Sequence, residues 1–170
     1  MSGAERFFDT SVLLYLLSSE DEKADRVEQL LAQSGTISIQ VLNEFRAVAT
    51  RKLSLSLTEV REVLDTVRNV CTTHALTEET YDRGIHVFER YRFSLYDSMI
   101  VSSALLAQCK TLLSEDLQHG QIIDGQLTVI NPFVSSQGGT RTYEQGSRWP
   151  LSQTQRRPTV SGIKTRQEDE

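Results

Sequence analysis

The stretch RFFDTSVLLYLL, residues 6–17, decides the fold of this chain. Residues 6–8 have the apolar pattern of a short buried strand, and the apolar run at residues 12–17 is typical of a buried helix. Asp9 lies between the two. A charge beside a core costs several kcal/mol unless a cation or hydrogen-bond donors compensate it. Asp9 is therefore expected to have such a partner.

Strand and helix patterns alternate along the rest of the chain. Further strands are predicted at residues 35–39, 111–113 and 127–130. Helices are predicted over residues 24–31, from a cap at Thr58 to Cys71, from a cap at Thr77 through Glu89, and from Asp97 to Gln108. Strands separated by helices imply right-handed crossovers and a mainly parallel sheet covered on both faces. The predicted fold class is α/β.

Three more carboxylates lie next to apolar runs, as Asp9 does: Glu44, Asp97 and Asp116. In an open α/β sheet, ligands bind outside the carboxyl ends of the strands. Asp9 and Asp116 follow predicted strands, Glu44 lies in the first turns of the next helix, and Asp97 opens a later one. All four are therefore expected to converge at one edge of the sheet.

A shared cation would compensate such a group of acids. Mg²⁺ and Mn²⁺ prefer carboxylate oxygen and water as ligands, and none of the four segments contains His or Cys. The sequence therefore predicts an oxygen-ligated Mg²⁺ or Mn²⁺ site and not a zinc site.

Each carboxylate taken alone also has an ordinary explanation. Asp9 and Asp97 are suited to capping helices, and Glu44 could form an ion pair with an arginine of its own helix. Asp116 could be a turn residue. The metal-site hypothesis depends on all four acids lying at the same edge.

Composition divides the chain into a folded body, residues 1–133, and a polar tail, residues 134–170, expected to be disordered. The net charge of -5 argues against a protein that holds nucleic acid by bulk positive charge alone. The tail carries six basic and four acidic residues, so it is either a solvated extension or a tether for RNA. Cys71 and Cys109 lie far apart without a CxxC motif, which predicts reduced core residues and a cytoplasmic protein. The apolar run at residues 12–17 is short and is interpreted as a buried helix, so no membrane partner is expected.

The combined pattern resembles the PIN domain, and most closely the VapC-like ribonuclease toxins of toxin–antitoxin pairs. The resemblance is carried by Asp9-Thr10-Ser11 after a strand, Asn43-Glu44-Phe45 in a helix, Tyr96-Asp97 opening another, and Ser114-Glu115-Asp116 after a core strand. It extends over roughly residues 4–133.

The resemblance implies a three-layer fold and a metal-dependent endoribonuclease, acting as a homodimer that a small antitoxin restrains. It also implies an acidic quartet for catalysis and metal binding, with three supporting polar groups. The quartet is Asp9, Glu44, Asp97 and Asp116, and the supporting groups are Thr10, Ser11 and Ser114.

Phosphodiester hydrolysis fits these residues on chemical grounds. Asp9, Asp97 and Asp116 are the predicted metal ligands, and Glu44 is expected to orient or deprotonate the attacking water. An acidic protein must offset repulsion of RNA locally, and Arg46 and Arg92 are candidates for contacting its phosphates. The alternative is a non-catalytic module whose acidic pocket accepts an arginine from a protein partner.

Overall fold

The computed structural model describes residues 5–134 of the chain. The predicted boundary near residue 133 lies at the end of this range, and residues 135–170 of the predicted tail lie outside it. The division into body and tail therefore stays a prediction.

Six strands form one sheet in the order β3-β2-β1-β4-β6-β5, and all neighbours are parallel except β5 and β6. The strands are β1 (Arg6–Phe8), β2 (Gly35–Ser38), β3 (Cys71–His74), β4 (Thr111–Leu113), β5 (Ile122–Ile123) and β6 (Leu127–Ile130). The mainly parallel α/β sheet predicted from the sequence is confirmed.

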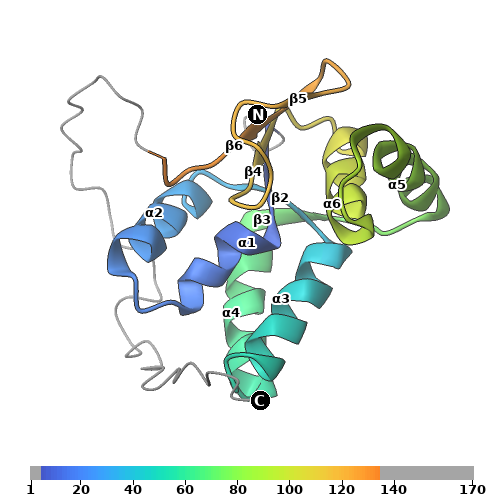
Figure 1. Cartoon of the computed structure of the whole chain (residues 1–170). Coiled ribbons are helices and arrows are strands. Elements are labelled where there is room, and N and C mark those ends of the chain that lie inside the picture. Colours follow the sequence, from blue (N-terminus) through green and yellow to red (C-terminus); the bar gives the residue numbers. More distant parts are fainter. Residues whose placement is uncertain (1–4, 135–170) are drawn as a thin grey trace, which may run out of the picture.

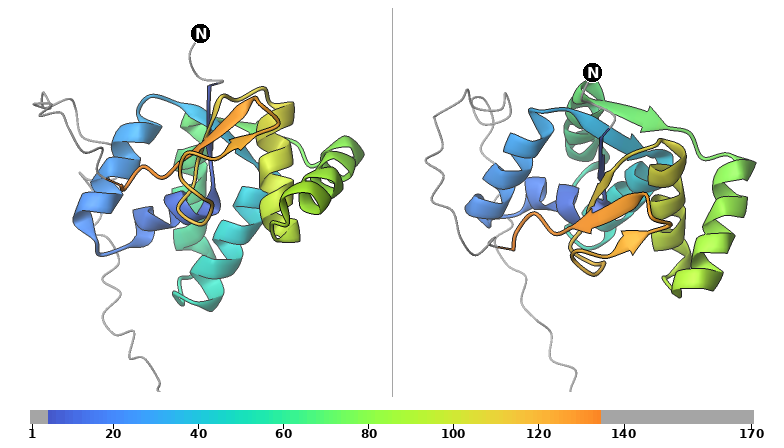
Figure 2. Two further views of the ribbon diagram at one scale, coloured as in Figure 1. Left: turned by 45° about the horizontal axis from the view of Figure 1, so that its top comes forward. Right: turned by 90° about the horizontal axis from the view of Figure 1, so that it is seen from above.

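Helices cover the sheet on both sides, with α1 and α2 opposite α5 and α6 (Figures 1 and 2). The helices are α1 (Thr10–Leu13), the 3₁₀ helix η1 (Leu14–Leu17), α2 (Asp21–Leu31), α3 (Ile39–Arg51), α4 (Leu57–Val70), α5 (Glu78–Tyr91) and α6 (Leu95–Leu106). The arrangement confirms the predicted three layers.

Strand β1 lies in the middle of the sheet and fixes where the acids meet. It pairs with β2 on one side and β4 on the other, with Phe8 opposite Leu113. The chain leaves β1 toward β2 and returns to its other side as β4, so a topological switch point lies between β1 and β4. The residues that follow these two strands, Asp9 and Ser114, therefore lie side by side.

The hydrophobic core holds β1 in place from both faces. Phe7 and Phe8 are fully buried, as are Phe45 of α3 and Leu112 of β4. Helix α6 is buried over almost its whole length, because Ser98 through Leu105 are all buried. Such burial explains the apolar, aperiodic sequence of this helix.

Helices α4 and α5 both begin with a capping motif, and one of their two predicted caps is wrong. Helix α5 begins after the predicted cap Thr77, whose hydroxyl accepts a hydrogen bond from the Thr80 N–H. Helix α4 begins earlier than predicted, because Ser56 is the cap and forms a capping box with Glu59. The prediction of Thr58 as the cap is wrong.

The sequence also missed two strands. The helix predicted to reach Cys71 ends at Val70, and Cys71 begins β3. Strands β3 and β5 lie at the two edges of the sheet, where polar and exposed positions weaken the apolar pattern.

Both cysteines are buried and free, as predicted. No helix within residues 5–134 is long and apolar enough to cross a membrane.

Gly35 allows β2 to approach β1 closely. A Cβ atom at this position would lie 2.4 Å from Cε2 of Phe8 and 3.2 Å from the backbone oxygen of Arg6. Gly35→Ala should lower the free energy of unfolding by about 1–3 kcal/mol, because neither the buried ring nor the backbone can move freely. Urea denaturation followed by circular dichroism measures this change.

Gly84 is the matched control. A Cβ there would meet only the end of the Met99 side chain, at 2.6 Å, which can rotate away, and alanine favours the helix. Gly84→Ala should therefore cost much less than Gly35→Ala. Equal losses in the two variants would contradict the packing account.

Candidate metal-binding active site

Asp9 is the most deeply buried of the four predicted acids, with 3% of its surface exposed. Its Oδ2 atom accepts hydrogen bonds from Ser11 Oγ at 2.8 Å and from Ser114 Oγ at 2.7 Å. Asp9 occupies the residue before α1, but its side chain makes no capping hydrogen bond there. The capping explanation for Asp9 is therefore wrong.

The environment of Asp9 raises its pKa from 3.8 to about 6. Burial is the largest cause, and the hydrogen bonds from Ser114 and Ser11 oppose it. Repulsion by Asp97 and Asp116 raises the pKa further. Since Asp97 also raises the pKa of Asp116, after burial as the main cause, these three carboxylates form one electrostatic group.

Two donors hold the carboxylate of Glu44, and one of them is the residue that follows Asp9. Thr10 Oγ1 donates to Glu44 Oε2 at 2.9 Å, and Gln40 Nε2 donates to Oε1 at 2.9 Å. Gln40 lies one turn earlier on α3, whereas Thr10 follows Asp9 directly. Thr10, the first residue of α1, thus joins Glu44 to the segment that follows β1. None of the described salt bridges pairs Glu44 with an arginine of its own helix, as the ordinary explanation required.

Asp97 lies in the first turn of α6, which begins at Leu95 and not at Asp97. Ser94 is the cap: its Oγ accepts a hydrogen bond from the Asp97 N–H at 3.1 Å and donates to Asp97 Oδ2 at 2.7 Å. The Asp97 carboxylate is therefore not needed as a cap.

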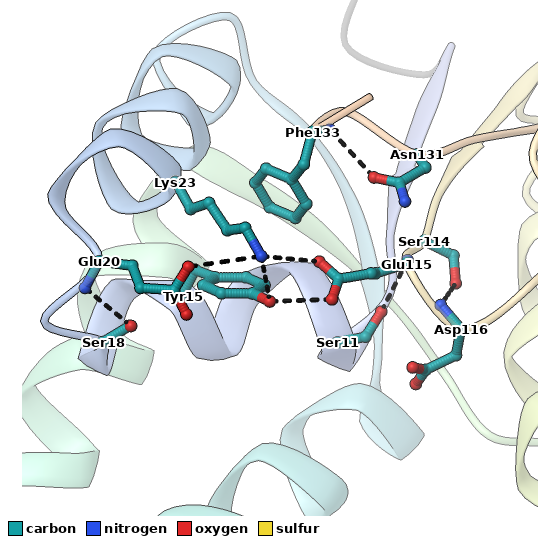
Figure 3. Close-up of polar contacts among 10 residues, drawn as sticks. All are labelled: Ser11, Tyr15, Ser18, Glu20, Lys23, Ser114, Glu115, Asp116, Asn131 and Phe133. Atoms are coloured by element: carbon teal, nitrogen blue, oxygen red, sulfur yellow. Dashed lines mark hydrogen bonds and ion pairs between the residues drawn. The ribbon is translucent and has the colours of Figure 1, made fainter. Parts of the chain in front are cut away.

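Asp116 lies in the loop after β4, and Ser114 shapes that loop. The Ser114 hydroxyl accepts a hydrogen bond from the Asp116 N–H at 3.2 Å while donating to Asp9. The Asp116 carboxylate turns away from the side chain of its neighbour Glu115 (Figure 3). It lines a cleft of about 530 Å³ together with Ser11 and Tyr15.

The charge of this group fits a divalent cation. Among the salt bridges of residues 5–134, none involves Asp9, Asp97 or Asp116. In the same part of the chain, no three acidic, His or Cys side chains are arranged as a ready-made metal cage. Mg²⁺ does not require such a cage, because it keeps several waters and binds through one or two carboxylates. The ligand roles remain predictions.

Arg46 and Arg92, the two predicted phosphate contacts, form no ion pair with the four acids among the described salt bridges. Arg46 is two residues from Glu44 on α3, so the two side chains leave the helix in different directions, and Arg46 lines a second cleft between α3 and α4. Arg92 is exposed and ends α5 in a left-handed conformation, two residues before Ser94. Their roles toward RNA stay predictions.

One residue of the site, Gln40, was not predicted from the sequence. Gln40 holds Glu44 but lies in a segment that reads as an ordinary transition from strand to helix. Its spacing of four residues from Glu44 is the only signal that could have identified it.

The raised pKa of Asp9 predicts how stability depends on pH without metal. The folded state binds more protons than the unfolded state between about pH 4 and pH 6, so stability due to protonated Asp9 is lost as the pH rises through this window. Asp9→Asn removes this loss, because the amide oxygen can still accept from Ser11 and Ser114. The variant's free energy of unfolding relative to wild type should rise by up to about 3 kcal/mol from pH 4 to pH 7.

Urea denaturation at each pH, in chelator, measures this difference. Asp82→Asn, at an exposed position on α5, is the control and should show no such trend. A difference between Asp9→Asn and wild type that stays constant across the range would contradict the account of Asp9.

Solved structures share this fold at low sequence identity. A toxin–antitoxin complex from Klebsiella pneumoniae aligns with a TM-score of 0.57 and 18% identity, over 76% of this chain and 98% of that chain. Mycobacterium tuberculosis VapC20, a sarcin–ricin loop cleaving toxin, aligns with a TM-score of 0.54 and 16% identity, over 66% of this chain and 92% of that chain. VapBC2 from Rickettsia felis, bound to a DNA fragment from its promoter, aligns with a TM-score of 0.53 and 17% identity, over 73% of this chain and 96% of that chain.

Sequence comparison identifies the family. No curated protein sequence matches the chain. The family model of the PIN domain matches residues 6–122, which include the four predicted acids and every strand up to the start of β5. The chain belongs to the PIN domain family.

Proposed function

We propose that this chain is a Mg²⁺- or Mn²⁺-dependent endoribonuclease that acts as the toxin of a toxin–antitoxin pair. The observation that carries the proposal is the buried Asp9 carboxylate, whose pKa is raised by repulsion from Asp97 and Asp116 and which has no basic partner among the described salt bridges. A protein keeps a charge that its own donors compensate only in part at a cost to its stability, and functional sites are where this cost is tolerated. Membership of the PIN domain family and the similarity in fold to toxins support the substrate class.

Asp9, Asp97 and Asp116 are the residues that would hold the metal. Ser11 and Ser114 both donate to Oδ2 of Asp9, which fixes the orientation of the carboxylate and leaves Oδ1 for a ligand. When bound, the ion would neutralise phosphate oxygens and lower the pKa of a water molecule. The ion would also relieve the repulsion among the three carboxylates.

Glu44 is proposed to orient the attacking water and accept its proton. Thr10 and Gln40 hold the two oxygens of Glu44, so the carboxylate has a fixed direction. A base that is oriented in advance loses little entropy when the substrate binds. Arg92, near Asp97 in sequence, and Arg46 are the proposed contacts for RNA phosphates.

The proposed protein partners are an antitoxin and a second copy of the chain. Two of the similar structures are described as toxin–antitoxin assemblies. Helix α5 presents Tyr81 and Phe88, both exposed and seven residues apart on one face, and α4 begins with the exposed Leu57. Exposed apolar residues of this kind are typical of interaction surfaces.

Asp97→Asn tests the proposed chemistry. The amide oxygen can still accept the hydrogen bond from Ser94, so the fold should be retained. Cleavage of RNA should fall by about 100-fold or more, because a proposed metal ligand is lost. The assay incubates purified protein with cellular RNA in Mg²⁺, in Mn²⁺ and in chelator, and identifies the product ends.

Wild-type protein should cut only with metal and leave a 5′-phosphate and a 3′-hydroxyl. Asp82→Asn, the exposed control on α5, should cut like wild type. Cleavage that survives chelation, or products with a cyclic phosphate, would refute the metal-dependent mechanism. Equal cutting of matched DNA would overturn the RNA assignment alone. A well-folded protein that cuts neither would favour the alternative, a protein-binding module with an acidic pocket.

A further inference from the structure

Lys23, Tyr15 and Glu115 form a polar network near Asp116 (Figure 3). Lys23 Nζ donates to the Tyr15 hydroxyl at 2.9 Å, and this hydroxyl donates to Glu115 Oε1 at 2.9 Å. Lys23 Nζ also lies 3.7 Å from Glu115 Oε2. The network joins the neighbouring η1 and α2 to the loop after β4, where Glu115 lies 100 positions from Tyr15 in sequence.

Aromatic rings pack against the network, whose Lys23 and Glu115 side chains are 33% and 34% exposed. The Phe133 ring meets the Tyr15 ring edge-on, with the ring centres 4.7 Å apart. Lys23 Nζ lies 4.4 Å from the centre of the Tyr15 ring and 5.3 Å from that of Phe133. The Phe133 backbone N–H donates to Asn131 Oδ1 at 3.0 Å, which holds the ring over the network.

Glu115 depends on Lys23 for compensation of its charge. Its Oε2 atom is buried and has no hydrogen-bond partner among residues 5–134, so the ammonium group of Lys23 is its nearest described compensation. Removing the ammonium group would leave this buried oxygen without compensation, and the carboxylate would then tend to turn toward water. Loss of Lys23 should therefore displace the Glu115 side chain.

The backbone of Glu115 belongs to the proposed active site. Its N–H donates to Ser11 Oγ at 3.1 Å, and Ser11 Oγ donates to Asp9 Oδ2 at 2.8 Å. The residues on either side of Glu115 are Ser114, which donates to Asp9, and Asp116. A shift of Glu115 would therefore disturb Asp9 and Asp116 together.

We propose that Lys23 is a positioning residue for the metal site, which it reaches through Tyr15 and Glu115. The inference rests on the proposed function, because it needs a metal bound by Asp9 and Asp116. Tyr15 and Glu115 line the same cleft as Asp116, so the network also forms a wall of the space beside the acids. Lys23 does not touch the metal or the substrate in this account.

A positioning role and a purely electrostatic role of Lys23 predict opposite changes in metal affinity when Lys23 is replaced. A lysine near a divalent cation repels it, so removing the positive charge alone would tighten metal binding. Removing a residue that orients the ligands would weaken it, typically by about 10-fold or more. The direction of the change in metal affinity therefore separates the two roles.

The test measures Mn²⁺ binding to metal-free protein by calorimetry. Lys23→Met keeps the length of the side chain and removes its charge, and it should raise the Kd for Mn²⁺ by about 10-fold. Tyr15→Phe keeps the ring that packs on Phe133 and removes the hydroxyl, and should also raise the Kd. Lys23→Arg, which restores the charge, should recover part of the affinity.

The chain contains a matched control of the same chemistry. Arg83 pairs with Asp124 at 3.0 Å, and the Tyr91 hydroxyl donates to Asp124 at 2.9 Å, but none of the three has a described hydrogen bond or ion pair to the four acids. Arg83→Met should lower the melting temperature without changing the Kd for Mn²⁺.

Each outcome decides a different point. Unchanged or tighter Mn²⁺ binding in Lys23→Met, with normal binding by wild type, would overturn the positioning role and leave the proposed function intact. A lower melting temperature with unchanged affinity would make Lys23 merely structural. If Lys23→Met does not fold, Tyr15→Phe decides by the same criteria. Wild-type protein that neither binds Mn²⁺ nor cuts RNA would refute the proposed function itself.

Discussion

The hydrogen bond from Ser114 to Asp9 is the contact on which the rest of the site depends. It spans 105 positions in sequence and exists because β1 and β4 pair in parallel, with Phe8 opposite Leu113. That register places the two residues that follow the strands next to each other. Ser11, Thr10 and Glu115 then connect to this pair, so one strand pairing organises both sides of the site.

The cost of the site falls on the stability of the fold. Asp9 is buried among donors that stabilise its charged form, yet burial and two neighbouring carboxylates outweigh them and raise its pKa. The three carboxylates therefore repel one another in the folded protein, and a bound cation would relieve this repulsion. The stability of the fold would then depend on the concentration of the ion. The network of Lys23, Tyr15 and Glu115 supports the same loop with attractive contacts.

Much of this arrangement could be predicted from the sequence. Apolar patterns predict the strand before Asp9, the helix that carries Glu44 and the parallel sheet. Ligands of such a sheet bind outside the carboxyl ends of its strands, which predicts where Asp9 and Asp116 lie. Strand β3 was missed because an edge strand needs little apolar surface, and its Thr72 is exposed. The role of Lys23 could not be predicted, because only the folded chain brings it to Tyr15 and Glu115. Residues two positions apart on a helix point in different directions, so the helix that carries Glu44 directs the side chain of Arg46 away from that of Glu44.

The central claim is that Asp9, Asp97 and Asp116 share one site for a divalent cation. Crystals grown with MnCl₂ and measured near the manganese absorption edge test it most directly, because the anomalous signal locates the ion without reference to activity. The account predicts a peak within direct coordination distance of Asp9, with Asp97 and Asp116 bound to it directly or through water. Saturating Mn²⁺ that leaves this position empty, with the three carboxylates bonded only to protein groups, would contradict the account.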